Sequence, residues 1–331
     1  MKPKHIAIVG ATGAVGREML DVLRRRNFPV ASVRLLASAR SAGTKVIHAG
    51  GELTVDELRP DSFGGVEIAL FSAGGATSRE FAPAAVKAGA VVIDNSSAFR
   101  QLPEVPLVIP EINAEDAQNH RGIIANPNCT IAVALMALAP LHRAFGLKRV
   151  FAASYQAVSG AGAKAIVELR RQVEAIVAGQ PVQTAVYPHQ IAFNVLPHVD
   201  SFRESGYTGE EVKMQDEARK ILHLPELRLS ATCVRVPVYR AHSVALSAEF
   251  ERPVNLAAAQ AAIQAFPGIR LVDNPAKNEY PMPLHCAGQD DCEVGRMRLD
   301  SALDNGLAMW VCGDQLLKGA ALNAVQIAEL L

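Results

Sequence analysis

The chain has 331 residues, more than one hydrophobic core usually organises, so its length predicts two domains. Hydrophobic residues make up 50% of it and charged residues 20%, which is typical of a globular protein and not of a disordered one. Lys plus Arg and Asp plus Glu number 33 each. A net charge of zero gives no general attraction to nucleic acid or to an anionic membrane, and neither partner is expected.

The cysteine spacing and the length of the apolar runs bear on the cellular compartment of the protein. Five cysteines are scattered without a CxxC pair or the spacing of a disulfide framework, at Cys129, Cys233, Cys286, Cys292 and Cys312. The amino terminus leads directly into a strand pattern, and no uninterrupted apolar run has membrane-spanning length. We therefore expect a protein of the reducing cytoplasm. The nine histidines form no ligand-spaced cluster, so no metal site is predicted.

In the first part of the chain, strand and helix patterns alternate. Strands are expected at 5–10, 33–38, 66–73, 90–97 and 122–127, and helices at 13–26, 76–89 and 128–145. Such alternation predicts right-handed βαβ units and a parallel, Rossmann-type sheet.

From about Leu147 the pattern changes to α+β with a mostly antiparallel sheet. Strands are expected at 147–160 and along 228–250, and helices at 162–179, 208–222 and 318–331. Thr208 with Glu211 three residues later has the spacing of a capping box. We expect residues 1–127 plus 312–331 to form a nucleotide-binding domain, and residues 128–311 to form a catalytic and dimerisation domain.

A glycine-rich turn follows the first expected strand. Gly10, Gly13 and Gly16 in "VGATGAVG" have GxxGxxG spacing between a strand and a helix. Glycines there allow close backbone approach of a phosphate to free N–H groups at a helix N-terminus. The alternative is a tight turn without a ligand, but the strand before it and the helix after it favour a dinucleotide site.

The residues after the second expected strand favour NADP over NAD. An NAD site usually has a carboxylate there for the ribose 2′-hydroxyl, but "LLASARSAGTK" has none. It has Ser38, Arg40, Ser41 and Lys45, whose hydroxyl and cationic groups suit a 2′-phosphate. The alternative interpretation is a solvated basic loop.

Cys129 differs from the other cysteines, which have no local pattern beyond that of buried thiols. In "ANPNCT", Pro127 prevents an earlier helix start and Asn128 is a favourable N-cap, so Cys129 lies in the first helical turn. The helix dipole and free N–H groups stabilise a thiolate there.

His242 is the candidate acid/base. Along a single strand it would share a face with Arg240, while Arg235 would lie on the other face unless a bulge occurs at Pro237; spacing alone does not link these residues to Cys129.

Over nearly its whole length the chain resembles the aspartate-β-semialdehyde dehydrogenase family, in its bacterial branch. The matching segments, in family order, are "GATGAVG", "SAGGATS", "IDNSSAFR", "ANPNCT", "YQAVSGAG", "GYTGEEVKM", "ATCVRVPVYRAHS" and "KGAALNAVQIAE".

The resemblance implies a role for each matching residue. Cys129 would be the nucleophile, His242 the acid/base and Gln156 the group that orients substrate beside the cysteine. Arg235 would bind the substrate carboxylate, Arg100 and Lys213 the phosphate, and Asn128 and Glu210, which adjoins Glu211, further parts of the substrate. The cofactor contacts would be Gly10, Thr12, Gly13, Ala14, Val15, Gly16, Ser38, Arg40, Ser41, Ser72, Gly74, Ser159, Gly160 and Gln315.

The implied reaction is NADPH-dependent reduction of β-aspartyl phosphate to aspartate semialdehyde with release of phosphate, through a thioester on Cys129, with His242 protonating the leaving thiolate or relaying protons. It would serve biosynthesis of lysine and diaminopimelate, threonine, methionine and isoleucine, in a homodimer or dimer of dimers. One departure is that the family commonly has Ser-Thr after the cysteine, where this chain has Thr130-Ile131. The alternatives are another acyl-phosphate reductase, such as an N-acetyl-γ-glutamyl-phosphate reductase or a glyceraldehyde-3-phosphate dehydrogenase-like protein, and a non-catalytic paralogue.

Overall fold

The computed structural model describes residues 2–48 and 51–331, which form two compact units. The first unit contains Met1–Asn128 and Ala320–Leu331, and the second contains Cys129–Gly319. The chain thus returns to the first unit at Ala320, later than the expected residue 312. The reason is that Gly306–Gly313 forms a strand in the sheet of the second unit, so the expected boundary divides that strand.

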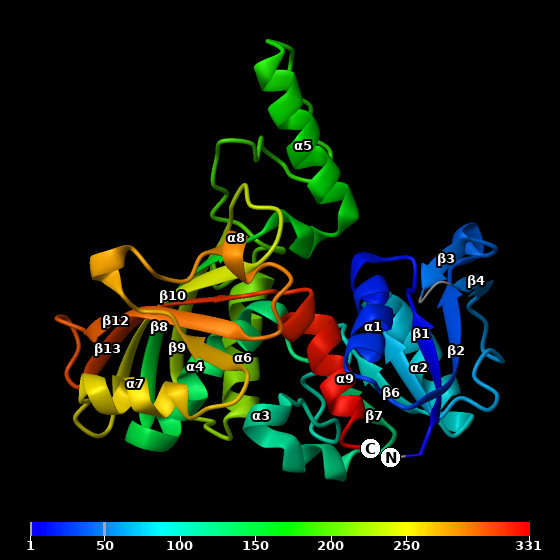
Figure 1. The fold of residues 1–331 in the computed structure, drawn as a ribbon, viewed down its shortest axis with the longest axis horizontal. Coiled ribbons are helices and arrows are strands. Elements are labelled where there is room, and N and C mark those ends of the chain that lie inside the picture. The colour runs from blue at the N-terminus through cyan, green and yellow to red at the C-terminus, as the bar shows by residue number, and fades with distance from the viewer. Residues whose placement is uncertain (1, 49–50) are drawn as a thin grey trace. The chain divides into compact units, whose positions relative to one another are not determined.

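A seven-stranded sheet organises the first unit (Figure 1). Its strand order is β3-β4-β2-β1-β5-β6-β7, and all neighbouring pairs are parallel except β3 with β4. The strands are β1 (Lys4–Val9), β2 (Val30–Ala37), β3 (Lys45–His48), β4 (Gly51–Glu57), β5 (Ile68–Phe71), β6 (Val91–Asp94) and β7 (Ile123–Ala125). The parallel sheet is confirmed, whereas the β3–β4 hairpin was not expected from the sequence.

Helices cover this sheet because their apolar residues recur at helical spacing. The helices are α1 (Ala14–Arg25), α2 (Gly75–Lys87), α3 (Pro110–Asn113) and α9 (Leu322–Ala328), with 3-10 turns at Ala39–Ser41 and Ala114–Asn119. In α1, Met19, Leu20, Val22 and Leu23 are buried, and the helix also lies against α9 from the end of the chain. The carboxyl ends of β1, β2 and β5 are therefore held at one edge, where ligands bind in open α/β sheets.

The second unit contains a six-stranded, mixed and mostly antiparallel sheet in the order β11-β12-β13-β10-β8-β9. Only β11–β12 and β8–β9 pair in parallel. The strands are β8 (Leu147–Gln156), β9 (Arg228–Arg235), β10 (His242–Phe250), β11 (Ile269–Leu271), β12 (Cys292–Leu299) and β13 (Gly306–Gly313).

The helices of the second unit are α4 (Cys129–Phe145), α5 (Ala163–Val177), α6 (Gly209–Ile221), α7 (Leu256–Gln264) and α8 (Pro283–Cys286), with 3-10 turns at Val158–Ala161 and Pro275–Lys277 and a π-helix at Leu317–Ala321. Helix α4 is buried on every side from Thr130 to Leu141 and lies against β8 and β10. Helix α5 instead extends away from the sheet (Figure 1). A continuously buried α4 holds its first residue, Cys129, in a fixed place.

The segment 228–250 is not one strand, so the expected face relation of Arg235, Arg240 and His242 is wrong. Residues 236–241 form a loop, and β9 and β10 lie on opposite sides of β8. Pro237 lies in this loop, where its missing N–H interrupts no ladder. Arg235 therefore ends one strand and His242 begins another.

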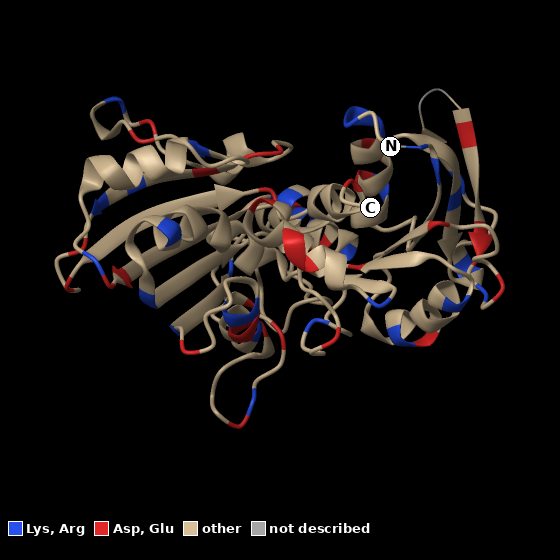
Figure 2. Ribbon diagram, turned by 90° about the horizontal axis from the view of Figure 1, so that it is seen from below, with Lys and Arg blue, Asp and Glu red and all other residues tan. Residues whose placement is uncertain are grey.

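Charged residues of both signs are interspersed along both units (Figure 2). Within the described residues, no helix is both long enough and apolar enough to span a lipid bilayer.

Candidate active site

Cys129 and His242 meet although 113 positions separate them in the sequence. Cys129 is the first residue of α4 and His242 the first of β10, and Cys129 Sγ lies 3.5 Å from His242 Nε2. The thiol is half-buried and the imidazole is completely buried. A helix N-terminus and an imidazole thus both face one sulfur, which is the arrangement that activates a cysteine nucleophile.

The other ring nitrogen of His242 determines its tautomer. The backbone N–H of Ala157 donates to His242 Nδ1 at 3.1 Å, so the proton of the neutral ring is on Nε2 and faces Cys129 Sγ. Burial, together with the nearby Arg235 guanidinium, holds the pKa of His242 well below its usual value of 6.5. In this structure His242 is therefore a neutral hydrogen-bond donor to the sulfur.

Two glycines leave room for this pair. A Cβ at Gly319, in the π-helix, would lie 2.6 Å from Cys129 Cβ. A Cβ at Gly160 would lie 2.9 Å from Arg235 Nη1 and 3.3 Å from two atoms of the His242 ring. Close approach thus restricts residue 319 to glycine, whereas a side chain at residue 160 would displace the Arg235 guanidinium and the His242 ring. No sequence pattern indicated this role for Gly319.

Arg235 presents a buried cation to the same region, and its guanidinium carbon lies 6.0 Å from the centroid of the Tyr187 ring. Its Nη1 donates to the carbonyl oxygen of Ala157 at 2.7 Å, while its buried Nε has no hydrogen-bond partner and no carboxylate pairs with it among the described residues. Because an unpaired buried guanidinium is costly, this arrangement favours an anionic ligand.

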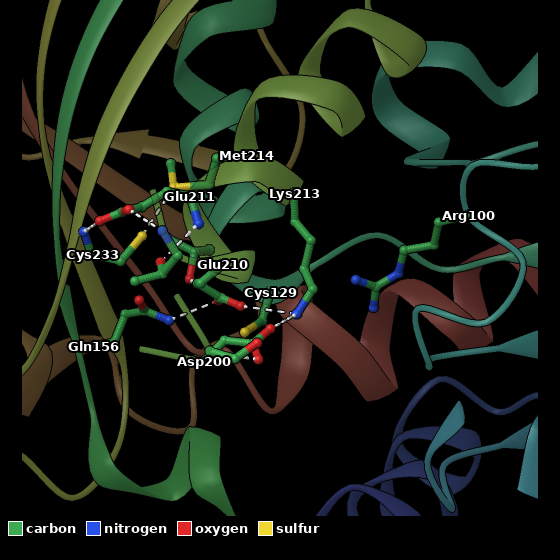
Figure 3. Close-up of polar contacts among 12 residues, drawn as sticks. Arg100, Cys129, Gln156, Asp200, Glu210, Glu211, Lys213, Met214 and Cys233 are labelled. Atoms are coloured by element: carbon green, nitrogen blue, oxygen red, sulfur yellow. Dashed lines mark hydrogen bonds and ion pairs between the residues drawn. The ribbon is translucent and has the colours of Figure 1, made fainter. Parts of the chain in front are cut away.

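The two adjacent acidic residues of α6 have different roles (Figure 3). Glu211 completes the capping box with Thr208, as expected, and also accepts a hydrogen bond from the backbone N–H of Cys233. Glu210 instead accepts from Gln156 Nε2 at 3.0 Å and from the Thr130 hydroxyl at 3.4 Å. Glu210 therefore links Gln156 of β8 to Thr130 of α4, the residue that follows Cys129. The Thr130 hydroxyl is one of the hydrogen-bond donors to the Glu210 carboxylate.

Lys213 lies between two carboxylates in Figure 3. Its Nζ is 2.6 Å from Asp200 Oδ2 and 3.5 Å from Glu210 Oε2. Burial tends to raise the pKa of Asp200, but hydrogen bonds from Lys213 and from the N–H of Ser201 outweigh it, and the pKa is lowered. No sequence pattern indicated Asp200, because it lies in a loop 13 positions before its partner.

The remaining cysteines are buried and unsuited to nucleophilic attack. Burial raises the pKa of Cys233 to about 12. The pKa of Cys286 is also raised, by its hydrogen bond with Cys312 and by burial. Cys129 is the only one of the five cysteines that is not fully buried.

A second candidate site is a cavity of about 450 Å³ within the first unit. Residues at and just after the ends of β1 and β2 and after β5 line it, including Gly10, Thr12, Gly13, Ser38, Arg40, Ser41 and Ser72. Leu58 and three residues of α2, namely Thr77, Glu80 and Phe81, complete the lining. Gly10 has φ +85°, and a Cβ there would clash with the carbonyl oxygen of Ser72, so only glycine fits this turn. Lys45 lies on β3, outside this lining.

Other expected cofactor residues lie around this turn or in the second unit. Ala14, Val15 and Gly16 form the start of α1, and Gly74 precedes α2. Ser159, Gly160 and Gln315 belong to the second unit, where Gln315 Nε2 donates to Ser159 Oγ at 2.5 Å. Their contacts with a cofactor stay predictions.

Arg100 and Asn128 are both buried in the first unit. Arg100 Nε and Nη2 donate to the backbone carbonyl oxygens of Asn126 and Asn95, at 2.8 and 2.7 Å. Asn128 directly precedes Cys129 at the start of α4. Their substrate roles also stay predictions.

Comparison with known proteins decides the family. The model described as "Semialdehyde dehydrogenase, NAD binding domain" matches residues 5–120, and "Semialdehyde dehydrogenase, dimerisation domain" matches residues 138–318. Aspartate-semialdehyde dehydrogenase of Aquifex aeolicus is 53% identical, with 99% of this chain and 97% of the relative covered. The chain belongs to the aspartate-semialdehyde dehydrogenase family.

Further relatives of this family match over a similar extent. Aspartate-semialdehyde dehydrogenase of Synechocystis is 51% identical, with 99% of this chain and 97% of the relative covered. A crystal structure of aspartate semialdehyde dehydrogenase II from Vibrio cholerae, complexed with ASA, has a TM-score of 0.97 and 42% identity, covering 100% of this chain and 98% of that one. The resemblance noted from motifs is thus confirmed across both units.

Proposed function

We propose that the chain reduces β-aspartyl phosphate to aspartate semialdehyde with NADPH, releasing phosphate, and that Cys129 is the nucleophile. The observation that carries this proposal is the 3.5 Å contact between Cys129 Sγ and His242 Nε2 at the start of α4, beside the unpaired Arg235. The names of its close relatives and the ASA complex of the Vibrio cholerae structure support the substrate.

The chemistry begins at Cys129. Its thiolate, stabilised by the helix N-terminus and by the Nε2–H of His242, attacks the carbonyl carbon of the acyl phosphate. The carbon–oxygen bond to phosphate breaks, the departing phosphate takes up one proton from solvent, and a thioester remains on Cys129. A bound reduced nicotinamide supplies the hydride that reduces the thioester carbon. The resulting oxyanion collapses, the carbon–sulfur bond breaks, and the thiolate returns to its hydrogen bond with His242.

Substrate recognition is assigned to charges around this pair. The Arg235 guanidinium fits a carboxylate through paired N–H groups. Glu210, held by Gln156, offers a carboxylate to an amino group, and Lys213 provides a cation for phosphate. Arg100, in the first unit, is also proposed to contact phosphate, because it matches the family motif. Lys213 now pairs with Asp200, so phosphate competes with that carboxylate for the ammonium group.

NADP is the proposed cofactor because the lining of the first-unit cavity fits it. The glycine turn after β1 allows phosphate approach, and β2 is followed by Ser38, Arg40 and Ser41, not by a carboxylate. Arg40 and the two hydroxyl groups suit a 2′-phosphate.

We also propose a cytoplasmic homodimer, or a dimer of dimers, formed through the outer face of the second sheet. Phe151 and Tyr155 on β8 are exposed there, and Tyr155 contacts Trp310 of β13 with ring centroids 5.1 Å apart. The match to a family dimerisation domain supports this assignment.

Phosphate-dependent reduction of NADP in the presence of aspartate semialdehyde tests the activity in the reverse direction. We expect turnover that requires both phosphate and aspartate semialdehyde. A panel with N-acetylglutamate semialdehyde and glyceraldehyde 3-phosphate tests the substrate, and preference for either would contradict the proposal.

A further inference from the structure

The loop of residues 236–241 places His242, and its last residue has an unfavourable backbone conformation. Ala241 has φ +71°, in the left-handed region that favours glycine, and its side chain is completely buried. His242 follows it directly and begins β10. The direction in which the imidazole enters the site therefore depends on a strained residue that its surroundings must hold in place.

Two consecutive residues after β13 hold this end of the loop. Gln315 Oε1 accepts a hydrogen bond from the N–H of Ala241 at 2.8 Å, and Asp314 Oδ2 lies 2.5 Å from Arg240 Nε. Both Gln315 and Asp314 are buried. The nitrogen of the Gln315 side-chain amide is also hydrogen-bonded, since Nε2 donates to Ser159 Oγ. Both polar groups of the Gln315 side chain are thus engaged within the second unit.

We propose that Gln315 is a positioning residue for His242, acting through the backbone of Ala241. The inference rests on the proposed role of His242 beside Cys129. Without the Gln315 acceptor, the buried N–H of Ala241 loses its hydrogen bond while the residue remains in its unfavourable conformation. Both effects favour rotation of the 240–241 peptide, and this rotation moves the adjoining His242 Nε2 away from Cys129 Sγ.

A cofactor contact of Gln315 would also affect turnover, so the test uses the cofactor-free protein. The measurement is the rate of Cys129 alkylation by iodoacetamide as a function of pH, with the labelled site mapped by mass spectrometry. The other four cysteines are buried. A thiolate that loses a charge-assisted hydrogen bond is less populated at a given pH, so Gln315→Leu should slow alkylation at pH 7 about tenfold and shift the profile to higher pH.

Ala241→Gly is the matched rescue variant. Glycine adopts φ +71° without the cost that alanine has, so Gln315→Leu in this background removes only the hydrogen bond of the residue-241 N–H, and the loop depends less on Gln315. Alkylation in Ala241→Gly/Gln315→Leu should be within about threefold of Ala241→Gly alone. This second comparison stays valid if Gln315→Leu by itself does not fold, which circular dichroism would show.

Two results would overturn the proposal: an unchanged alkylation profile in Gln315→Leu, or an equal loss in the Ala241→Gly background. His242→Asn separates this outcome from failure of the proposed site. If His242→Asn leaves alkylation unchanged, His242 does not support the thiolate and the proposed function is at fault. If His242→Asn slows alkylation and Gln315→Leu does not, only the role of Gln315 is wrong.

Discussion

In the first unit, the cavity is lined mainly by residues at the carboxyl ends of strands and by the first turns of α2, whereas in the second unit the reactive cluster draws on α4, β8, β9, β10 and α6. A cofactor with repeated phosphate and ribose groups can be met by backbone turns at one sheet edge. A reacting carbon needs a nucleophile, a donor and charges at fixed mutual distances. We therefore expect single substitutions to reduce turnover or substrate binding strongly in the second unit, and to change cofactor preference more moderately in the first.

Apart from loss of the Cys129 nucleophile, the largest effect of a substitution is expected at His242. His242→Asn keeps an acceptor near the Ala157 N–H but does not reach Cys129 Sγ. Turnover should fall about 10²–10³-fold, as for loss of a hydrogen-bond donor to a charged reacting group, measured as kcat with both substrates saturating. A loss of less than tenfold would show that the Nε2–H of His242 is not the group that stabilises the thiolate.

Arg235→Lys tests the unpaired buried cation. The substitution keeps the charge but removes the planar fork, so KM for aspartate semialdehyde should rise at least about tenfold while KM for NADP stays within about twofold. Steady-state kinetics with each substrate varied in turn separates the two constants. An equal rise in both would show a general disturbance of the unit and not loss of carboxylate recognition.

Arg40→Ala tests the first unit. The ratio of kcat/KM for NADP to that for NAD should fall about tenfold, because only NADP has the 2′-phosphate that a guanidinium can pair with. Lys45→Ala is the matched control, since Lys45 lies outside the cavity lining and pairs with Glu52. An unchanged ratio in Arg40→Ala would remove Arg40 from cofactor selection.

The smallest expected effect is the change in the free energy of unfolding with pH. The pKa of His242 is lowered in the folded protein, so protonation favours the unfolded state. Its contribution to stability is complete above pH 6.5 and is lost as the pH falls towards the folded-state pKa, by about 1.4 kcal/mol per pH unit. Burial also lowers the pKa of His142, with the same sign.

Denaturant unfolding of the wild type and His242→Asn between pH 7 and pH 5 isolates the contribution of His242. The variant should lose less free energy of unfolding over this range, because only the His142 contribution remains of the two. Parallel curves for the two proteins would show that folding does not lower the pKa of His242.

Sequence patterns predicted the features that depend on local order. The turn at Gly10, the capping box at Thr208 and the place of Cys129 at the start of a helix each involve neighbouring residues whose types determine a backbone conformation. The parallel and antiparallel sheets followed from alternation and periodicity, and the family motifs supplied the rest of the residue set.

Long-range contacts were not predictable in this way. The 236–241 loop, which separates Arg235 from His242, depends on strand pairing with β8, and a period-two pattern cannot show where one strand ends within an apolar run. The tautomer of His242 depends on a backbone N–H of Ala157, which carries no side-chain signal. Asp200 and Gly319 likewise acquire their roles from partners distant in the sequence.

The central claim is that Cys129 forms the covalent bond to the substrate, and its most direct test compares wild type with Cys129→Ala. The measurement is phosphate-dependent NADP reduction with aspartate semialdehyde, supported by circular dichroism to show that both proteins fold. We predict essentially no turnover in Cys129→Ala, because the thioester route is removed. Near-normal turnover in this variant would contradict the account.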